Sequence, residues 1–138
     1  GWSMKKQNLF ISGYHFFLAL LFIYVGAQVI QGRLGEYPRE WLTKLPFTSW
    51  VLPGFAILLL GLSHLFVAGI CLFQSRSIVA RLTLLMGSFL IVSGILSIMV
   101  LGETYLATVE LILLGSIHLV LGGIILWKAA HSSQSIRI

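Results

Sequence analysis

Two histidines in matched surroundings are the side chains of this chain best suited to chemistry. His64 lies in the stretch GLSHLFVAGICLF and His118 lies in GSIHLVLGGIILW, so both follow a Gly-x-x-His-x-x-x-small-Gly pattern. Both stretches are apolar, which predicts that each histidine lies inside a membrane-spanning helix. An imidazole in that setting can ligate a haem iron, hold a metal ion or share a proton. If the two histidines lie at similar depth on diagonal helices of a bundle, their rings can face each other across its core.

A structural role is the alternative for the two histidines. Each ring can join neighbouring helices through a hydrogen bond to a hydroxyl or carbonyl group, and Ser63 and Ser116 lie near the histidines in sequence. We rank this role first, contact with a ligand or proton second, and haem or metal binding third. No arginine is available inside a span for haem propionates, and two histidines alone make a poor zinc site. We therefore predict no cofactor and no metal, with His64 and His118 as the haem ligands of the alternative.

Three further polar side chains interrupt the apolar runs. Glu110 is an acidic residue inside the last run, and an ionisable group in a span is a functional hypothesis by default. Its depth is shallow, so anchoring at the membrane interface is an equal alternative. Gln28 is a candidate ligand contact near the outer end of the first run. His15 lies near the other end of that run, where we expect a polar group that seeks the interface.

Composition and motifs argue against several classes of function. The sequence contains no carboxylate pair, no Ser/His/Asp set, no glycine-rich phosphate loop and no HExxH motif, so nothing indicates an enzyme. The net charge of +5 comes from basic residues at the ends of apolar runs, which gives no support for nucleic-acid binding. The single Cys71 cannot form a disulfide within the chain.

The elements that must position these residues are membrane-spanning helices. Charged residues make up 9% of the 138 residues and hydrophobic residues 58%, whereas soluble domains carry about 25% charged residues. About 20 apolar residues span a bilayer as a helix. The runs that qualify are 9–30, 51–73, 82–101 and 105–127, which predicts an all-α four-helix membrane bundle. We expect residues 1–3 to be a vector-derived addition, residues 4–138 to form a single transmembrane domain, and Pro38 to begin a short helix in the outer loop, residues 31–50.

The basic residues predict the orientation of the helices. Cytoplasmic ends of membrane helices carry an excess of Lys and Arg. Residues 31–50 carry Arg33, Arg39 and Lys44, and six basic residues lie at the opposite ends of the runs: Lys5, Lys6, Arg76, Arg81, Lys128 and Arg137. We therefore place both termini in the cytoplasm.

An internal repeat organises the runs into two hairpins. The matched histidine stretches pair the second run with the fourth, and YVGAQ from Tyr24 pairs more faintly with VSGIL from Val92 in the third. A duplicated helical hairpin explains both matches. Small residues at spacings of three and four let helix backbones approach closely in lipid, so we expect these faces to point inward. They comprise Gly61, His64 and Ala68; Gly115, His118 and Gly122; and Gly87, Leu90, Gly94 and Ser97.

The stretch LPFTSWVLPGFAILLLG, from Leu45 to Gly61, resembles a block in a family of small uncharacterised bacterial four-helix membrane proteins. In that family a Pro-Phe pair is followed by a Pro-Gly pair entering the second span, as Pro46-Phe47 and Pro53-Gly54 are here. The stretch VLGETYLATVELILLGSIHLVLGG is similar to the family's third-loop and fourth-span region. The resemblance implies multi-pass insertion in a bacterial cytoplasmic membrane. It implies no particular activity.

Together these features favour a non-enzymatic membrane protein that binds a small ligand, a lipid or a partner membrane protein. An oligomeric transporter or channel-like protein is the second hypothesis, and a bis-histidine haem protein is the third. The bilayer is the predicted surrounding. A second copy of the chain or another membrane protein is the candidate macromolecular partner.

Overall fold

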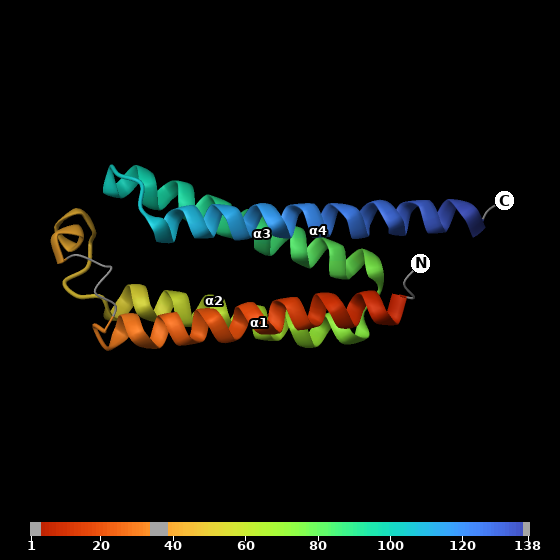
Figure 1. Cartoon of the computed structure of the whole chain (residues 1–138), viewed down its shortest axis with the longest axis horizontal. Coiled ribbons are helices and arrows are strands. Elements are labelled where there is room, and N and C mark those ends of the chain that lie inside the picture. Colours follow the sequence, from red (N-terminus) through yellow and green to blue (C-terminus); the bar gives the residue numbers. More distant parts are fainter. Residues whose placement is uncertain (1–3, 34–38, 137–138) are drawn as a thin grey trace. The chain divides into compact units, whose positions relative to one another are not determined.

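The computed structural model describes residues 4–33 and 39–136, and the regular elements of these residues are all helical. They are α1 (Met4–Ile30), the short 3-10 helix η1 (Arg39–Lys44), α2 (Val51–Phe73), α3 (Arg76–Leu101) and α4 (Leu106–Ile136) (Figure 1). Within the described part, four helices are long and apolar enough to cross a membrane: Lys5–Ile30, Val51–Phe73, Arg76–Leu101 and Leu106–His131. This confirms the all-α class with four candidate spans. Residues 1–3, Pro38 and Arg137, for which the sequence predicted particular roles, lie outside the described residues.

Three of the helices extend beyond the apolar runs that predicted them. α1 begins at Met4, α3 begins at Arg76 and α4 continues to Ile136, whereas α2 covers the predicted run. Hydropathy marks only the part of a helix that suits hydrocarbon, while backbone hydrogen bonding continues through charged residues. The start of α3 is set by Ser75, whose Oγ accepts a hydrogen bond from the Ile78 amide at 3.5 Å.

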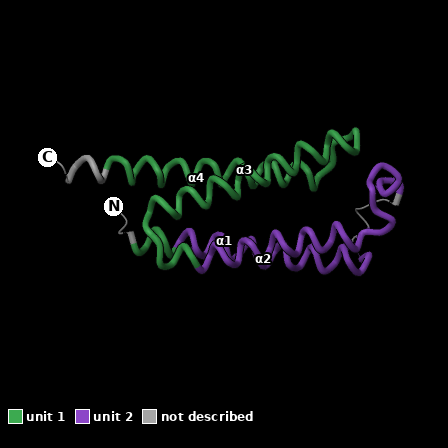
Figure 2. The backbone as a smooth tube through the Cα atoms, turned by 180° about the vertical axis from the view of Figure 1, so that it is seen from behind, with its two compact units in different colours: residues 1–9, 70–138 green, residues 10–69 purple. Residues whose placement is uncertain are grey.

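The chain divides into two compact units, shown in different colours in Figure 2. Residues 10–69 contain most of α1 and α2 together with η1, and we call this unit the first hairpin. Residues 1–9 and 70–138 form the other unit, in which α3 and α4 pack along each other, and we call this α3–α4 pair the second hairpin. Within each hairpin, the two helices contact each other directly.

Glycines bring the helix backbones of the first hairpin into contact. A Cβ atom added to Gly61 of α2 would lie 2.9 Å from the amide nitrogen of Ile23 and 3.0 Å from the carbonyl oxygen of Ala19, both in α1. A Cβ atom on Gly26 of α1 would lie 2.8 Å from the amide nitrogen of Leu58. Larger residues would push the helices apart, so close packing here depends on the absence of a side chain.

The second hairpin packs in the same way. A Cβ atom on Gly115 of α4 would lie 2.6 Å from the carbonyl oxygen of Gly87 and 3.0 Å from the amide nitrogen of Ile91, both in α3. A Cβ atom on Gly122 would lie 3.1 Å from the carbonyl oxygen of Ala80. Gly87, Leu90 and Gly94 are buried and Ser97 is half-buried, and the small-residue faces of α2 and α4 are buried, which confirms that these faces point inward.

The contacts of the two hairpins occur at corresponding positions. The contact of Gly61 with Ala19 and Ile23 is matched by that of Gly115 with Gly87 and Ile91. In the same way, the backbone approach of α2 to Gly26 is matched by the approach of α4 to Gly94. Between α1 and α3, Ala19 corresponds to Gly87, Ile23 to Ile91, and Gly26 to Gly94. Between α2 and α4, Leu58 corresponds to Ile112 and Gly61 to Gly115. Along each pair of helices the correspondence keeps one constant offset in sequence.

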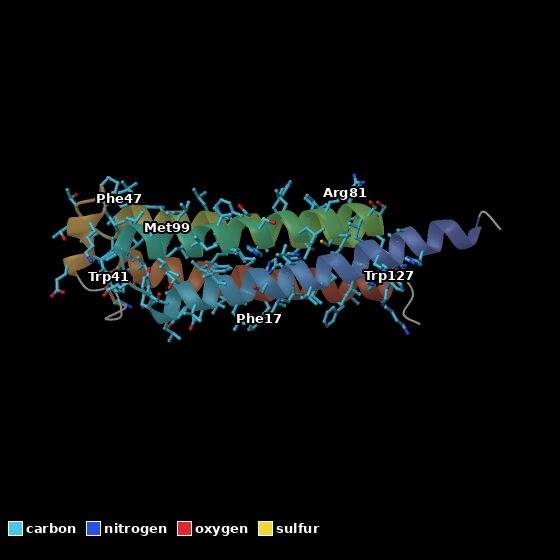
Figure 3. The ribbon with its side chains drawn as sticks, turned by 90° about the horizontal axis from the view of Figure 1, so that it is seen from above. Phe17, Trp41, Phe47, Arg81, Met99 and Trp127 are labelled. Atoms are coloured by element: carbon cyan, nitrogen blue, oxygen red, sulfur yellow. The ribbon has the colours of Figure 1, made fainter. Side chains whose placement is uncertain are left out.

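Large apolar side chains cover the outside of both hairpins. Phe17, Met99 and Trp127 are 65%, 71% and 60% exposed and are labelled in Figure 3. Soluble proteins do not expose apolar surface continuously along whole helices. The four apolar helices therefore indicate a multi-pass membrane protein.

Candidate functional site

Two histidines lie side by side in the interior of the first hairpin. His15 of α1 and His64 of α2 are both 0% exposed. Their ring centres are 5.5 Å apart, with the ring planes inclined by 39°. One ring nitrogen of His15 lies within 4.8 Å of one ring nitrogen of His64. We call these two residues the histidine pair.

The glycine contact between α1 and α2 sets the position of the histidine pair. His15 lies one turn before Ala19 on α1, and His64 lies about one turn after Gly61 on α2. Because Gly61 touches the Ala19 carbonyl group, the two helices are in close contact at this level. Residues one turn apart share a helix face, so both imidazoles point toward the neighbouring helix.

The hydrogen bonding of His64 selects one tautomer of its ring. Nδ1 of His64 lies 2.9 Å from the carbonyl oxygen of Leu60, one turn earlier in α2. A carbonyl oxygen only accepts hydrogen bonds, so Nδ1 carries the proton and Nε2 of the neutral ring carries the lone pair. Aromatic rings pack beside the pair: Phe22 lies 5.3 Å from the His64 ring and Tyr14 lies 5.4 Å from the His15 ring, centre to centre.

His118 occupies the corresponding position in the second hairpin and has the same tautomer. It is buried, and its Nδ1 lies 2.7 Å from the carbonyl oxygen of Leu114. Gly87 of α3 leaves room for it, because a Cβ atom there would lie 2.5 Å from the His118 Cβ. The position that corresponds to His15 is Thr83, also buried, whose hydroxyl donates to the carbonyl oxygen of Val79 at 2.9 Å. Within its own α3–α4 pair, His118 therefore has a threonine where His64 has a second imidazole.

The remaining predicted site residues lie on other surfaces of their helices. Ser63 and Ser116 are exposed, and each hydroxyl donates to a carbonyl oxygen of its own helix, on Leu59 and Ile112, at 2.8 Å. Glu110 is exposed on α4. Gln28 is half-buried on α1. Within the first hairpin, the polar residue whose ring packs beside His64 is therefore His15, and not the predicted Ser63 or Gln28.

The expectation that His15 seeks the membrane interface is wrong. The residue is completely buried, because it lies on the face of α1 that packs against α2. Ala19 and Gly26 mark that face, and His15 precedes Ala19 by one turn. Extending the small-residue spacing of α1 back toward its start is the sequence signal that could have found the residue.

The first hairpin thus holds two imidazoles with aromatic rings packed beside them. Neutral imidazoles bind transition-metal ions, exchange protons and pack against aromatic groups. A buried hydroxyl lies nearby in sequence, since Ser12 donates to the carbonyl oxygen of Ala68 at 2.7 Å and joins α1 to α2. In comparisons with known proteins, no protein-family model, no curated protein and no solved structure matches this chain.

Proposed function

We propose that this chain is a non-enzymatic, multi-pass membrane protein that binds a small ligand through imidazoles buried between its helices. The observation that carries the proposal is the histidine pair. Neutral imidazoles bind metal ions and exchange protons, so two of them side by side offer a ligand two contacts at one place.

The packing of the first hairpin supports ligand binding over a purely structural role for His64. Its Nδ1 bonds to Leu60 of its own helix, so that hydrogen bond does not connect α1 with α2. Close contact between the helices is supplied by Gly61 and Gly26, and a buried interhelical hydrogen bond is supplied by Ser12. The hairpin therefore has other means of holding its helices together.

Ligand-dependent stabilisation tests the proposal. Thermal unfolding of the purified protein is followed with hemin, a short-chain quinone and phospholipids of different head groups as separate additives. A ligand at about 100 times its dissociation constant stabilises the folded state by about 2.7 kcal/mol. We expect one additive to raise the midpoint of the wild type but not that of His15→Gln or His64→Gln. If every stabilising additive acts equally on the variants, the imidazoles are not the binding groups.

The haem alternative is examined in the same samples by absorption spectroscopy. A Soret band that disappears in both His64→Ala and His118→Ala would support haem ligation by those residues. A colourless, folded protein from haem-replete cells would exclude it.

Duplication of an ancestral hairpin accounts for the paired sequence patterns and the corresponding glycine contacts. The supporting observation is that the offset in sequence is constant within each pair of helices, for Ala19 to Gly87 as for Gly26 to Gly94, and for Leu58 to Ile112 as for Gly61 to Gly115. We place the basic ends of the helices in the cytoplasm of a bacterial cell, with both termini inside. Reporter fusions after Gln74 and after Glu103 test this orientation, and an active periplasmic reporter after Gln74 would reverse it.

An oligomeric transporter is the second candidate, because Glu110 is exposed within the candidate span of α4. A carboxylate facing lipid is costly, and an interface with another copy of the chain would cover it. Native mass spectrometry and liposome flux measurements on the wild type and Glu110→Gln test this candidate. An oligomer and an ion flux that both depend on Glu110 would favour transport over ligand binding.

A further inference from the structure

The histidine pair has the chemistry of a metal site, and this inference rests on the ligand-binding function proposed above. We propose that His15 and His64 bind a single copper(I) ion between α1 and α2. Both side chains are completely buried, and one ring nitrogen of each lies within 4.8 Å of the other. The site would lie inside the first hairpin, within candidate spans of the chain.

The geometry of the pair suits a bridging ion. Metal–nitrogen bonds of about 2.0–2.1 Å hold two ligand nitrogens about 3.3–4 Å apart, for bond angles between tetrahedral and linear. One ring nitrogen of each residue lies within 4.8 Å of the other, and rotation of either ring about its side-chain bonds can close the remaining distance. The ring centres are 5.5 Å apart, which is close enough for both imidazoles to reach one ion.

The tautomer of His64 is the one that metal-bound histidines use. Such residues donate one ring N–H to a carbonyl or carboxylate group, which orients the ring and places the lone pair on the other nitrogen. His64 meets this condition through its Nδ1 and the carbonyl oxygen of Leu60, at 2.9 Å. Nε2 of His64 is therefore the ligand atom.

Copper(I) is the ion that two imidazoles in a lipid environment fit best. Imidazole suits zinc, copper, iron and nickel, but zinc takes three or four protein ligands, and the first hairpin supplies the two imidazoles of the pair. Copper(I) is stable with as few as two nitrogen ligands, and its single charge costs less to bury than a double charge. The Phe22 ring beside His64 adds an aromatic face to the surroundings of the ion.

Competition with a chromophoric chelator tests the proposal. Purified protein in detergent is titrated with copper(I) under anaerobic, reducing conditions against bathocuproine disulfonate. We expect one copper ion per chain, with at least tenfold weaker binding in His15→Gln and in His64→Gln. His131→Ala is the matched control, because His131 is an exposed histidine whose Nδ1 also lies close to a carbonyl oxygen of its own helix, on Trp127. Cys71→Ala controls for binding by the single thiol, and both control variants should bind copper as the wild type does.

Circular dichroism and the thermal midpoint establish that each variant is folded. His15→Phe and His64→Phe are additional variants in which a ring fills the space of the imidazole but offers no ligand atom. X-ray absorption of the copper-loaded wild type should show two nitrogen ligands at short distance. Unchanged copper affinity in all four pair variants overturns the proposal, and so does a site that takes zinc(II) but not copper(I). If copper fails while an organic additive stabilises the wild type in a manner dependent on His64, ligand binding stands and the metal assignment is wrong. If neither binds, both are wrong.

Discussion

Replacing Gly115 with alanine should destabilise the second hairpin, whereas the same change at Gly123, two turns later on α4, should not. A Cβ atom at Gly115 would lie 2.6 Å from the carbonyl oxygen of Gly87 and 3.0 Å from the amide nitrogen of Ile91. Both atoms belong to the backbone of α3, so they cannot rotate away and the helices must separate. A Cβ atom at Gly123 meets nothing within 4 Å.

The expected size of the effect follows from these contacts. Overpacking of this kind costs about 1–3 kcal/mol. Alanine also improves helix propensity over glycine by about 1 kcal/mol, but this gain is common to Gly115→Ala and Gly123→Ala and cancels in their difference. The free energies of unfolding of the two variants should therefore differ by about 1–3 kcal/mol. For a domain of this size that is several degrees in the thermal midpoint, at about 4 °C per kcal/mol.

The single cysteine provides the assay. Cys71 is buried in the folded protein, so a thiol-reactive fluorophore labels it when the structure opens on heating. Midpoints are compared for the wild type, Gly115→Ala and Gly123→Ala in the same detergent. The first hairpin repeats the comparison with Gly61→Ala and Gly69→Ala, since a Cβ atom at Gly69 also meets nothing within 4 Å. Equal midpoints for the members of either pair would refute the argument that glycine contacts hold that hairpin together.

Further substitutions address hydrogen bonds at other positions. Ser12→Ala removes the buried hydrogen bond to Ala68 and should lower stability by about 0.5–1.5 kcal/mol, measured as a fall in thermal midpoint. Ser63→Ala is the control. The exposed Ser63 hydroxyl donates to a carbonyl oxygen of its own helix, so this substitution should leave the midpoint nearly unchanged. Ser75→Ala removes the N-cap of α3, whose Oγ accepts from the Ile78 amide, and should cost about 1 kcal/mol. If Ser75→Asp preserves the midpoint while Ser75→Ala lowers it, the loss is due to capping; equal losses would argue against it.

The candidate site could be predicted only in part. The matched patterns around His64 and His118 pointed to both residues, and both are buried. Ser63 was predicted to be a polar neighbour of His64, yet its hydroxyl is exposed on another side of α2. The partner that His64 has within its hairpin is His15, which the sequence reasoning placed at the interface. His15 lies beside His64 only because α1 is rotated about its axis so that this residue faces α2.

The composition of the sequence is sufficient to predict that the chain forms long apolar helices. Span number and approximate position depend on composition summed along the chain, and a stretch of about 20 apolar residues is sufficient. The spacing of small residues also indicated which faces pack, because close approach in lipid requires glycine or alanine. Which residues meet across α1 and α2 depends instead on how the two helices pack in the folded chain. These helices are apolar on nearly every side, so hydrophobic periodicity does not distinguish a buried face from a lipid-facing one. The contact of Gly61 with the backbone of Ala19 sets the register, and that register brings His15 beside His64.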